Sequence, residues 1–274
     1  MMELDKIYCG DNVEVLSGFP DECIDLTVTS PPYDNLRDYN GYTFDFEKLA
    51  AELYRVTKTG GVVVWVVGDA VVDGSETGTS FRQALGFMGQ GWKLHDTMIY
   101  KKSCPHPPNV RYWQEFEYML VFSKDAPKTF NPLMQPKQPS SSIRQKYARN
   151  VFTRGKDGQL RSLSQAGHAR MKKAAGNNNR VRSNVWEFAV GGGCIGDALA
   201  HKHPAVFPEA LARDHILSWS NPDDTVLDPF VGSGTTPKMC VEADRHYIGI
   251  DISEECCELA RRRVANAQPP LFVI

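Results

Sequence analysis

The stretch Val226-Leu-Asp-Pro-Phe-Val-Gly-Ser-Gly-Thr-Thr236 has the pattern of a buried strand that turns sharply into a helix. Aliphatic residues lead to Asp228, and Gly232 and Gly234 then supply the turn. Glycines at such a turn let the backbone pass close to a ligand. About 20 residues further on, a second apolar run ends in Asp251, where an acid suits a ribose diol.

The glycine turn does not complete the GxGxxG fingerprint of dinucleotide-binding proteins, because Pro237 stands at its third position. A dinucleotide therefore fits less well than a single nucleoside-like ligand such as S-adenosylmethionine. The alternative is a turn with a purely structural role, since similar loops occur in many α/β proteins.

Short apolar runs alternate with helical patterns along the rest of the chain. We expect strands at residues 6–9, 24–29, 62–67, 93–101, 116–123, 224–228 and 246–251. We expect helices at 12–17, 44–56, 79–88 and 208–220, from 236 and after Ser253, with Thr59-Gly-Gly61 ending the helix at 56. Strands that alternate with helices predict an α/β fold with a doubly wound, mostly parallel sheet.

A second stretch, Val28-Thr-Ser-Pro-Pro-Tyr33, ends a predicted core strand on two prolines, which cannot donate hydrogen bonds to a sheet. Ligands of a doubly wound sheet gather at the carboxyl ends of its strands, so this stretch is expected at the functional edge. The prolines stiffen the turn and present backbone carbonyls and the Tyr33 ring.

This rigid turn suits a planar base that carries an amino group. The amino nitrogen of cytosine or adenine is a poor nucleophile because its lone pair is delocalised into the ring. The Ser30 hydroxyl and the Pro31 carbonyl would accept its N–H bonds, and Tyr33 would stack on the ring, so catalysis would rest on positioning and electrostatics. The predicted catalytic residues are Ser30, Pro31, Pro32 and Tyr33. The alternative is a Pro-Pro turn that merely closes a strand.

Charge is distributed unevenly, although the net charge of the whole chain is only −2. Residues 137–182 contain twelve Lys or Arg and one acid, Asp157. Clustered cations neutralise phosphates and release counterions, which predicts a nucleic-acid-binding insert. Tyr147, Phe152 and Trp186 lie within or beside this run and suit contact with bases. The alternative is a solvated, partly disordered surface loop. The predicted DNA-binding residues are Arg144, Lys146, Arg149, Arg154, Lys156, Arg161, Lys172, Lys173 and Arg180.

Other features exclude several classes of protein. The seven cysteines form no CxxC pair, which indicates reduced thiols and a cytoplasmic protein. No signal peptide and no run of about 20 apolar residues is present, so no membrane partner is expected. His201 and His203 have no evident third ligand, so we expect no metal.

Three motifs together resemble those of the amino-DNA methyltransferases: Val28–Tyr33, Asp228–Thr236 and His203-Pro-Ala-Val-Phe-Pro208. Their order, with the catalytic motif first, a basic insert second and the cofactor motif last, is similar to the β-class, a circular permutation of the methyltransferase fold. The strand at 6–9 would then lie beside the strand at 247–251. The resemblance divides the chain into a catalytic half (1–130), a basic target-recognition insert (131–190) and a cofactor-binding half (191–274).

The resemblance implies S-adenosylmethionine as cofactor. Asp11 would lie where members of the family contact the adenine part of this cofactor, and the residues at 203–208 would line the pocket for its methionine part. The implied cofactor-binding residues are Asp11, His203, Pro204, Phe207, Asp228, Pro229, Phe230, Gly232, Gly234, Thr235, Asp251 and Ile252.

The implied function is site-specific transfer of a methyl group to the exocyclic amino group of a base flipped out of double-stranded DNA. The loop 34–43, with Arg37 as a further DNA-binding residue, would close over that base. Ser at position 30 is commoner in cytosine-N4 enzymes, which favours cytosine N4, with adenine N6 as the alternative. RNA or protein-glutamine methylation and a catalytically silent DNA-binding subunit are further alternatives. A homodimer and a cognate restriction endonuclease are left open as partners.

Overall fold

The computed structural model describes residues 2–32, 44–102, 111–112, 114–137, 152–162, 164–165, 179–189 and 208–269. The chain divides into two compact units, a larger one of Met1–Asn131 with Asn184–Ile274 and a smaller one of Pro132–Ser183. In the described part of the chain, no helix is long and apolar enough to cross a membrane.

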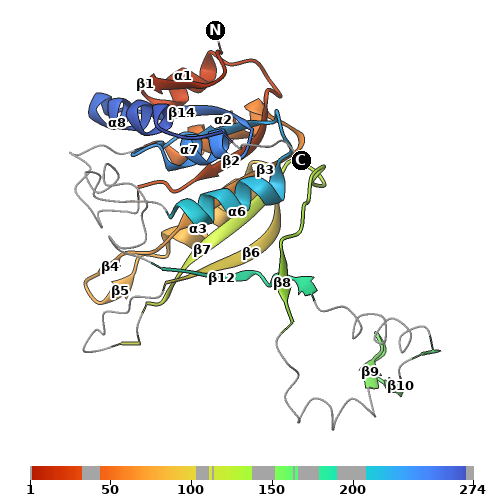
Figure 1. Ribbon diagram of the computed structural model, residues 1–274. Coiled ribbons are helices and arrows are strands. Elements are labelled where there is room, and N and C mark those ends of the chain that lie inside the picture. The colour runs from red at the N-terminus through yellow and green to blue at the C-terminus, as the bar shows by residue number, and fades with distance from the viewer. Residues whose placement is uncertain are drawn as a thin grey trace. The chain divides into compact units, whose positions relative to one another are not determined.

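The larger unit is built on an eight-stranded sheet (Figure 1). The strands lie in the order β1 (Lys6–Cys9), β14 (His246–Asp251), β13 (Thr225–Asp228), β2 (Ile24–Thr29), β3 (Thr57–Val67), β7 (Phe116–Ser123), β6 (Lys93–Lys102) and β12 (Val185–Phe188). The first five run parallel to their neighbours, whereas β7 is antiparallel to both β3 and β6. This confirms the predicted mostly parallel sheet.

The first and last strands of the chain pair with each other. β1 lies parallel to β14, with Cys9 opposite Asp251. The beginning of the chain therefore continues the sheet where its final strand leaves off, which confirms the predicted circular permutation.

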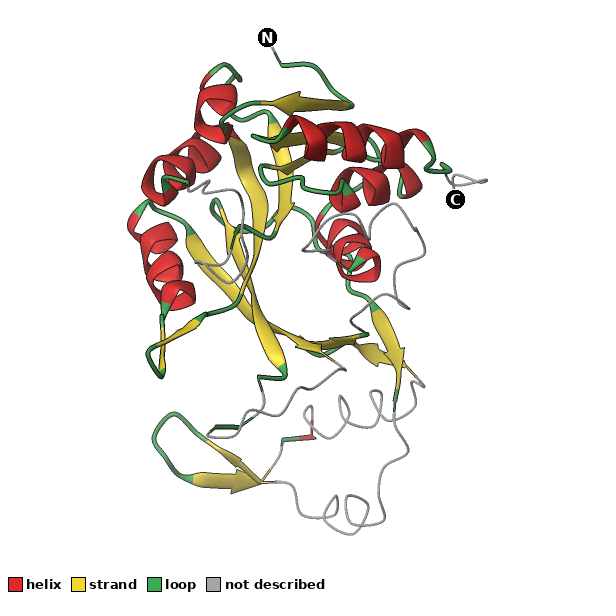
Figure 2. Ribbon diagram, turned by 90° about the vertical axis from the view of Figure 1, so that its left-hand side faces the viewer, coloured by secondary structure: helices red, strands yellow, loops and turns green. Residues whose placement is uncertain are grey.

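Helices cover both faces of this sheet, one layer on each side (Figure 2). One layer consists of α1 (Asn12–Ser17), α2 (Phe46–Val56) and α3 (Thr79–Gly89), and the other of α6 (Glu209–Trp219), α7 (Thr235–Glu242) and α8 (Glu254–Ala265). The predicted helices are thus present, and α2 begins two residues later than expected because Asp45 caps it, accepting a hydrogen bond from the Lys48 amide.

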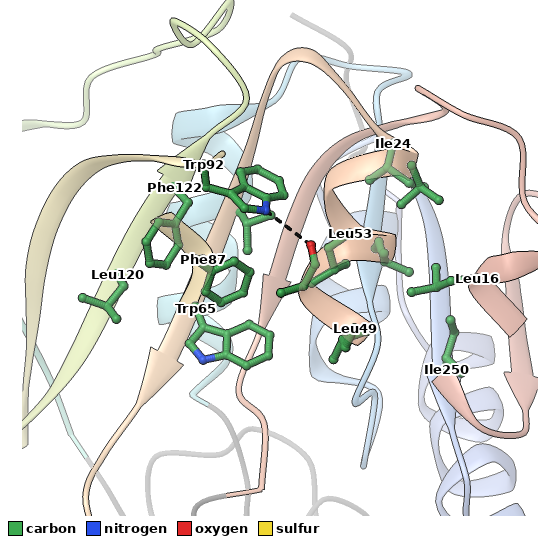
Figure 3. Close-up of a cluster of buried hydrophobic side chains, with 14 of the residues drawn as sticks. Leu16, Ile24, Leu49, Leu53, Trp65, Phe87, Trp92, Leu120, Phe122 and Ile250 are labelled. Carbon is green, nitrogen blue, oxygen red and sulfur yellow. Dashed lines mark hydrogen bonds between the residues drawn. The ribbon is translucent and has the colours of Figure 1, made fainter. Parts of the chain in front are cut away.

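Aromatic rings fill the core between the first helix layer and the sheet (Figure 3). Phe87 of α3 stacks on Phe122 at a ring distance of 4.6 Å and meets Trp65 of β3 edge-on at 5.0 Å. The Trp92 indole donates to the Ala50 carbonyl at 3.4 Å, so its N–H is not left unpaired in the core. This packing fixes β3, the neighbour of the strand that carries the proline motif.

The strand after α2 begins earlier than the predicted start at 62, so the expectation that Thr59-Gly-Gly61 ends the helix is wrong. α2 ends at Val56 and β3 begins at Thr57, so the strand runs through both glycines. Gly60 has a φ of +83°, and the β2–β3 register shifts between Ile24 and Leu26. The glycines therefore lie in an irregularity inside a continuous strand, where the tolerance of Gly60 for positive φ is needed.

The boundary of the basic insert also differs from the prediction. Residues 185–188 form β12, which pairs with β6 in the large sheet, so the smaller unit ends at Ser183 and not at 190. Trp186 is 5% exposed and its ring lies 4.6 Å from that of His215 in α6. The expectation that Trp186 contacts bases is wrong, because its side chain belongs to the core.

The smaller unit contains only short strands among its described residues. β8 (Met134–Pro136) pairs antiparallel with β11 (Asn179–Val181), and β9 (Phe152–Arg154) forms a hairpin with β10 (Leu160–Ser162). A further small hairpin, β4 (Val71–Val72) with β5 (Ser75–Glu76), belongs to the larger unit.

Candidate active site

The two decisive stretches of sequence meet at the carboxyl edge of the parallel strands. β2 and β13 are neighbours, and the Thr29 hydroxyl donates to Asp228 at 2.6 Å across 199 residues of sequence. The Thr236 hydroxyl donates to the Val28 carbonyl at 3.2 Å. The proline motif and the glycine turn are therefore held together by two direct hydrogen bonds.

Asp228 is buried at this junction. Besides the Thr29 hydroxyl, its carboxylate accepts the Phe230 amide at 3.1 Å. Burial raises the pKa of Asp228 to about 6, because removal from water disfavours the charged form. The carboxyl group links the two motifs, and its predicted contact with a cofactor stays a prediction.

The glycine turn has a shape that only glycine provides. Gly232 has a φ of +47°, and its amide donates to Asp251 at 2.9 Å. Gly234 has a φ of +81° and is the N-cap residue of α7, and a Cβ there would lie 2.7 Å from the Cα of Ala260 in α8. The turn is thus pressed against α8, and its conformation depends on the missing side chain.

Asp251, predicted for a ribose diol, lies half-buried at the end of β14. Its two oxygens accept the amides of Gly232 and Ser253, each at 2.9 Å. Ser253 in turn caps α8. A carboxylate has about four acceptor positions, so these bonds leave capacity for hydroxyl donors.

The end of β1 lies beside the same turn. Asp11, predicted at the adenine end, caps α1 by accepting the amides of Val13 and Glu14 at 2.9 and 3.0 Å. The buried Asn12 amide donates to the Pro229 carbonyl at 3.4 Å, while its Oδ1 meets no donor among the described residues. Asn12 is not among the residues predicted from the sequence, although it lies in the segment that follows the end of β1 and begins α1.

The structure describes only some of the remaining residues that were predicted for the site. Ser30 and Pro32 are half-buried and Pro31 is buried, directly after β2. Phe230 packs its ring 4.8 Å from Phe44, and Ile252 is 42% exposed. Tyr33, Arg37, His203, Pro204 and Phe207 lie outside the described residues, so their predicted roles stay predictions.

Three charged residues that no motif indicated support the glycine turn. Arg263 is fully buried and donates to Ser233 and to the Thr235 hydroxyl, and it pairs with Glu209, which also pairs with Lys238. Spacing on a helix gives no sign that such an arginine points inward.

Four of the predicted DNA-binding residues are described, and all four are exposed: Arg154, Lys156, Arg161 and Arg180. Arg154 donates to the Gly158 carbonyl at 2.7 Å, and Arg161 pairs with Asp157 at 2.5 Å, both within the β9–β10 hairpin. Arg144, Lys146, Arg149, Lys172 and Lys173 lie outside the described residues, as do Tyr147 and both histidines at 201 and 203.

Among the described residues, no group of three or more His, Cys, Asp or Glu side chains could hold a metal ion. The site is instead made of backbone amides, hydroxyls and two carboxyl groups at neighbouring strand ends. This set of hydrogen-bonding groups suits a polar organic ligand.

The fold and this site define a Rossmann-like α/β enzyme of the permuted kind, and comparison with known proteins identifies its family. The sequence model of the N6/N4 DNA methylase family matches residues 24–262. Orphan methyltransferase M.BamHII of Bacillus amyloliquefaciens is 52% identical over 248 residues, which are 89% of each chain. The chain belongs to the DNA methylase family and is a DNA methyltransferase, which confirms the resemblance.

Solved structures share the fold. The Thermus thermophilus protein TTHA0409, complexed with S-adenosyl-L-methionine, is 24% identical with a TM-score of 0.63, over 97% of this chain and 95% of that one. The PvuII DNA methyltransferase, which is cytosine-N4-specific, is 19% identical with a TM-score of 0.66, over 98% and 95%.

Proposed function

We propose that this DNA methyltransferase transfers a methyl group from S-adenosylmethionine to the N4 amino group of a cytosine flipped out of double-stranded DNA. The single observation that supports this most directly is the Thr29–Asp228 hydrogen bond of 2.6 Å. It joins the strand end that carries Ser30 to the strand end that carries the glycine turn. A methyl donor at the turn and an amino group at Ser30 would therefore lie side by side.

The cofactor is S-adenosylmethionine, the molecule bound in the TTHA0409 complex. Its sulfonium supplies an electrophilic methyl group. In this chain Asp251 has acceptor capacity left for ribose hydroxyls, and the close approach of Gly234 to Ala260 gives the turn a fixed shape. The Oδ1 of Asn12, which meets no donor in the described part of the chain, suits an amino group of the adenine part, since an amide oxygen is an acceptor.

The chemistry at the base rests on two acceptors. The Ser30 hydroxyl and the Pro31 carbonyl would accept the two N–H bonds of the amino group, which draws the nitrogen toward a tetrahedral shape and turns its lone pair outward. Tyr33 would stack on the base. Each of these contacts positions the amino group or stabilises its changing charge, so no covalent intermediate with the protein is required.

The exposed cations of the smaller unit support a role in DNA recognition. Lys156 lies in the turn of the β9–β10 hairpin, and Arg180 lies on the strand β11. We propose the smaller unit as the target-recognition part, between a catalytic half and a cofactor-binding half. Function on DNA fits a cytoplasmic location, whereas a homodimer and a cognate restriction endonuclease stay predictions.

The test is to incubate the purified protein with unmethylated DNA and S-adenosylmethionine, digest the DNA to nucleosides and identify the product by mass spectrometry. We expect N4-methylcytosine. N6-methyladenine as the product would agree with the proposed mechanism and contradict the assignment of cytosine as the target base. Methylation of RNA or of protein in place of DNA would contradict the proposal that DNA is the substrate.

A pair of serine variants tests the mechanism within the same assay. Ser30→Ala should lower kcat by about 10²-fold or more, the scale for loss of one positioned polar group. Ser17→Ala is the matched control, because Ser17 is exposed and donates to the Glu14 carbonyl of its own helix. Equal activity of the two variants would contradict the role of Ser30.

A further inference from the structure

Arg263, in the last turn of α8, has an exposed fraction of 0%. A buried charge is costly unless it is paired and hydrogen-bonded. Its Nη1 donates to the Ser233 carbonyl at 2.7 Å, to the Ser233 hydroxyl at 2.9 Å and to the Thr235 hydroxyl at 3.2 Å. The guanidinium therefore contacts both residues that flank Gly234.

The other side of the guanidinium faces an ion pair. Its Nη2 donates to Glu209 Oε1 at 2.7 Å, and the same oxygen accepts Lys238 Nζ at 2.7 Å. Glu209 is the first residue of α6, Lys238 lies in α7, and Arg263 lies in α8. Three helices are thus tied to the glycine turn by one carboxylate and two cations.

The arginine also holds the two hydroxyls beside the start of α7. The N-cap residue of α7 is Gly234, which carries no side chain, and Ser233 and Thr235 lie on either side of it. Arg263 occupies these two hydroxyls as acceptors. The arginine thereby fixes the residues on both sides of Gly234, and no side chain of the described residues bonds to the first amides of α7.

We propose that Arg263 is a positioning residue for S-adenosylmethionine. It holds the segment from Ser233 to Thr235 against α8 in the conformation that receives the cofactor, and it acts through the turn without touching the reacting atoms. Glu209 orients the guanidinium. This proposal rests on the proposed function, because the ligand of the turn is the methyl donor.

The test compares arginines in two places. Arg263→Met removes the donors and keeps the length of the side chain, and Lys238 still neutralises Glu209. Arg55→Met is the matched control: Arg55 also donates to two backbone carbonyls, at 2.8 Å each, and pairs with two carboxylates. Arg55 lies in α2, and its bonds to the Leu16 and Phe19 carbonyls stabilise the contact of α2 with α1 and the residues that follow α1.

We expect Arg263→Met to raise the Kd and the KM for S-adenosylmethionine about tenfold or more, since hydrogen bonds to a charged group are the stronger ones. At saturating cofactor, kcat should stay within about twofold, because the base-binding side is unchanged. Arg263→Lys should recover part of the affinity. Arg55→Met should lower the unfolding midpoint and leave the cofactor Kd unchanged. Calorimetry with S-adenosylmethionine measures Kd directly.

An unchanged cofactor Kd in folded Arg263→Met, or an equal rise in Arg55→Met, would overturn the proposal. If Arg263→Met does not fold, Arg263→Lys and Glu209→Gln replace it in the test. Each of these variants should raise the Kd for S-adenosylmethionine by less than Arg263→Met would. Binding and methylation are measured separately. A wild-type chain that binds cofactor and methylates no DNA would therefore overturn the proposed function alone, and one that binds no cofactor would overturn both.

Discussion

The glycine turn of the larger unit and the hairpin turn of the smaller unit each hold a glycine at positive φ, in different surroundings. Gly234 has a φ of +81° and Gly158 a φ of +78°. A Cβ on Gly234 would lie 2.7 Å from the backbone of Ala260, whereas a Cβ on Gly158 would meet nothing within 4 Å in the described part of the chain. The first turn is fixed by its neighbours and the second only by its own strands.

The arginines beside the two turns differ in the same way. Arg263 is fully buried and bonds to residues on both sides of Gly234. Arg154 and Arg161 are exposed and bond to the Gly158 carbonyl and to Asp157 of their own hairpin. Transfer of a methyl group needs donor and acceptor at fixed positions, whereas contact with phosphates needs exposed charge. The contrast therefore agrees with the roles that we propose for the two units, methyl transfer in the larger one and DNA recognition in the smaller one.

The largest expected effect separates the two glycines. Gly234→Ala should cost about 3 kcal/mol of unfolding free energy, because positive φ and overpacking against α8 add together. Gly158→Ala should cost only about 1 kcal/mol, from the positive φ alone. Urea unfolding of both variants measures the difference. If Gly234→Ala costs no more than Gly158→Ala, the turn is not fixed by α8 and the comparison fails.

The next effect depends on pH. The pKa of Asp228 is about 6 in the folded protein, above the usual 3.8, because the group is buried. The folded state therefore binds the proton more tightly, and this group's contribution to stability is lost as pH rises from about 4 to about 6. The loss should amount to about 2–3 kcal/mol.

Asp228→Asn removes this titration and keeps an oxygen that can accept the Thr29 hydroxyl. Its unfolding free energy should be flatter than that of the wild type between pH 4 and pH 6, as measured by urea unfolding at several pH values. Parallel curves for the two proteins would show that Asp228 does not titrate in this range.

Sequence patterns predicted the elements whose conformation is determined by residues that are neighbours in the sequence. The run before Asp228 and its two glycines predicted β13 and the turn into α7. These features follow from alternation, from glycine and from strand ends, which neighbouring residues determine. The pairing of β1 with β14 joins distant segments, and the motif order of the family implied it, not a local pattern.

Contacts between distant segments were not predictable in this way. The bond between Thr29 and Asp228 joins residues 199 positions apart, and the glutamate partner of Arg263 lies 54 positions away. Helical spacing did not show that Arg263 points inward. Trp186 follows a basic run but enters the large sheet, because its alternating neighbours fit the edge beside β6 better than a recognition loop.

The smallest effect concerns the exposed cations. Lys156→Ala should reduce the slope of log K against log salt for DNA binding by about 0.9, the value for one lost phosphate contact. Lys48→Ala is the control, because Lys48 of α2 is 72% exposed and pairs with Asp45 on the larger unit. Filter binding across a salt series gives both slopes. The stability of either variant should stay within about 0.5 kcal/mol of the wild type. Equal slopes for the two lysine variants would mean that the hairpin turn does not contact phosphates, and the exposed arginines beside it would then serve the hairpin and not the DNA.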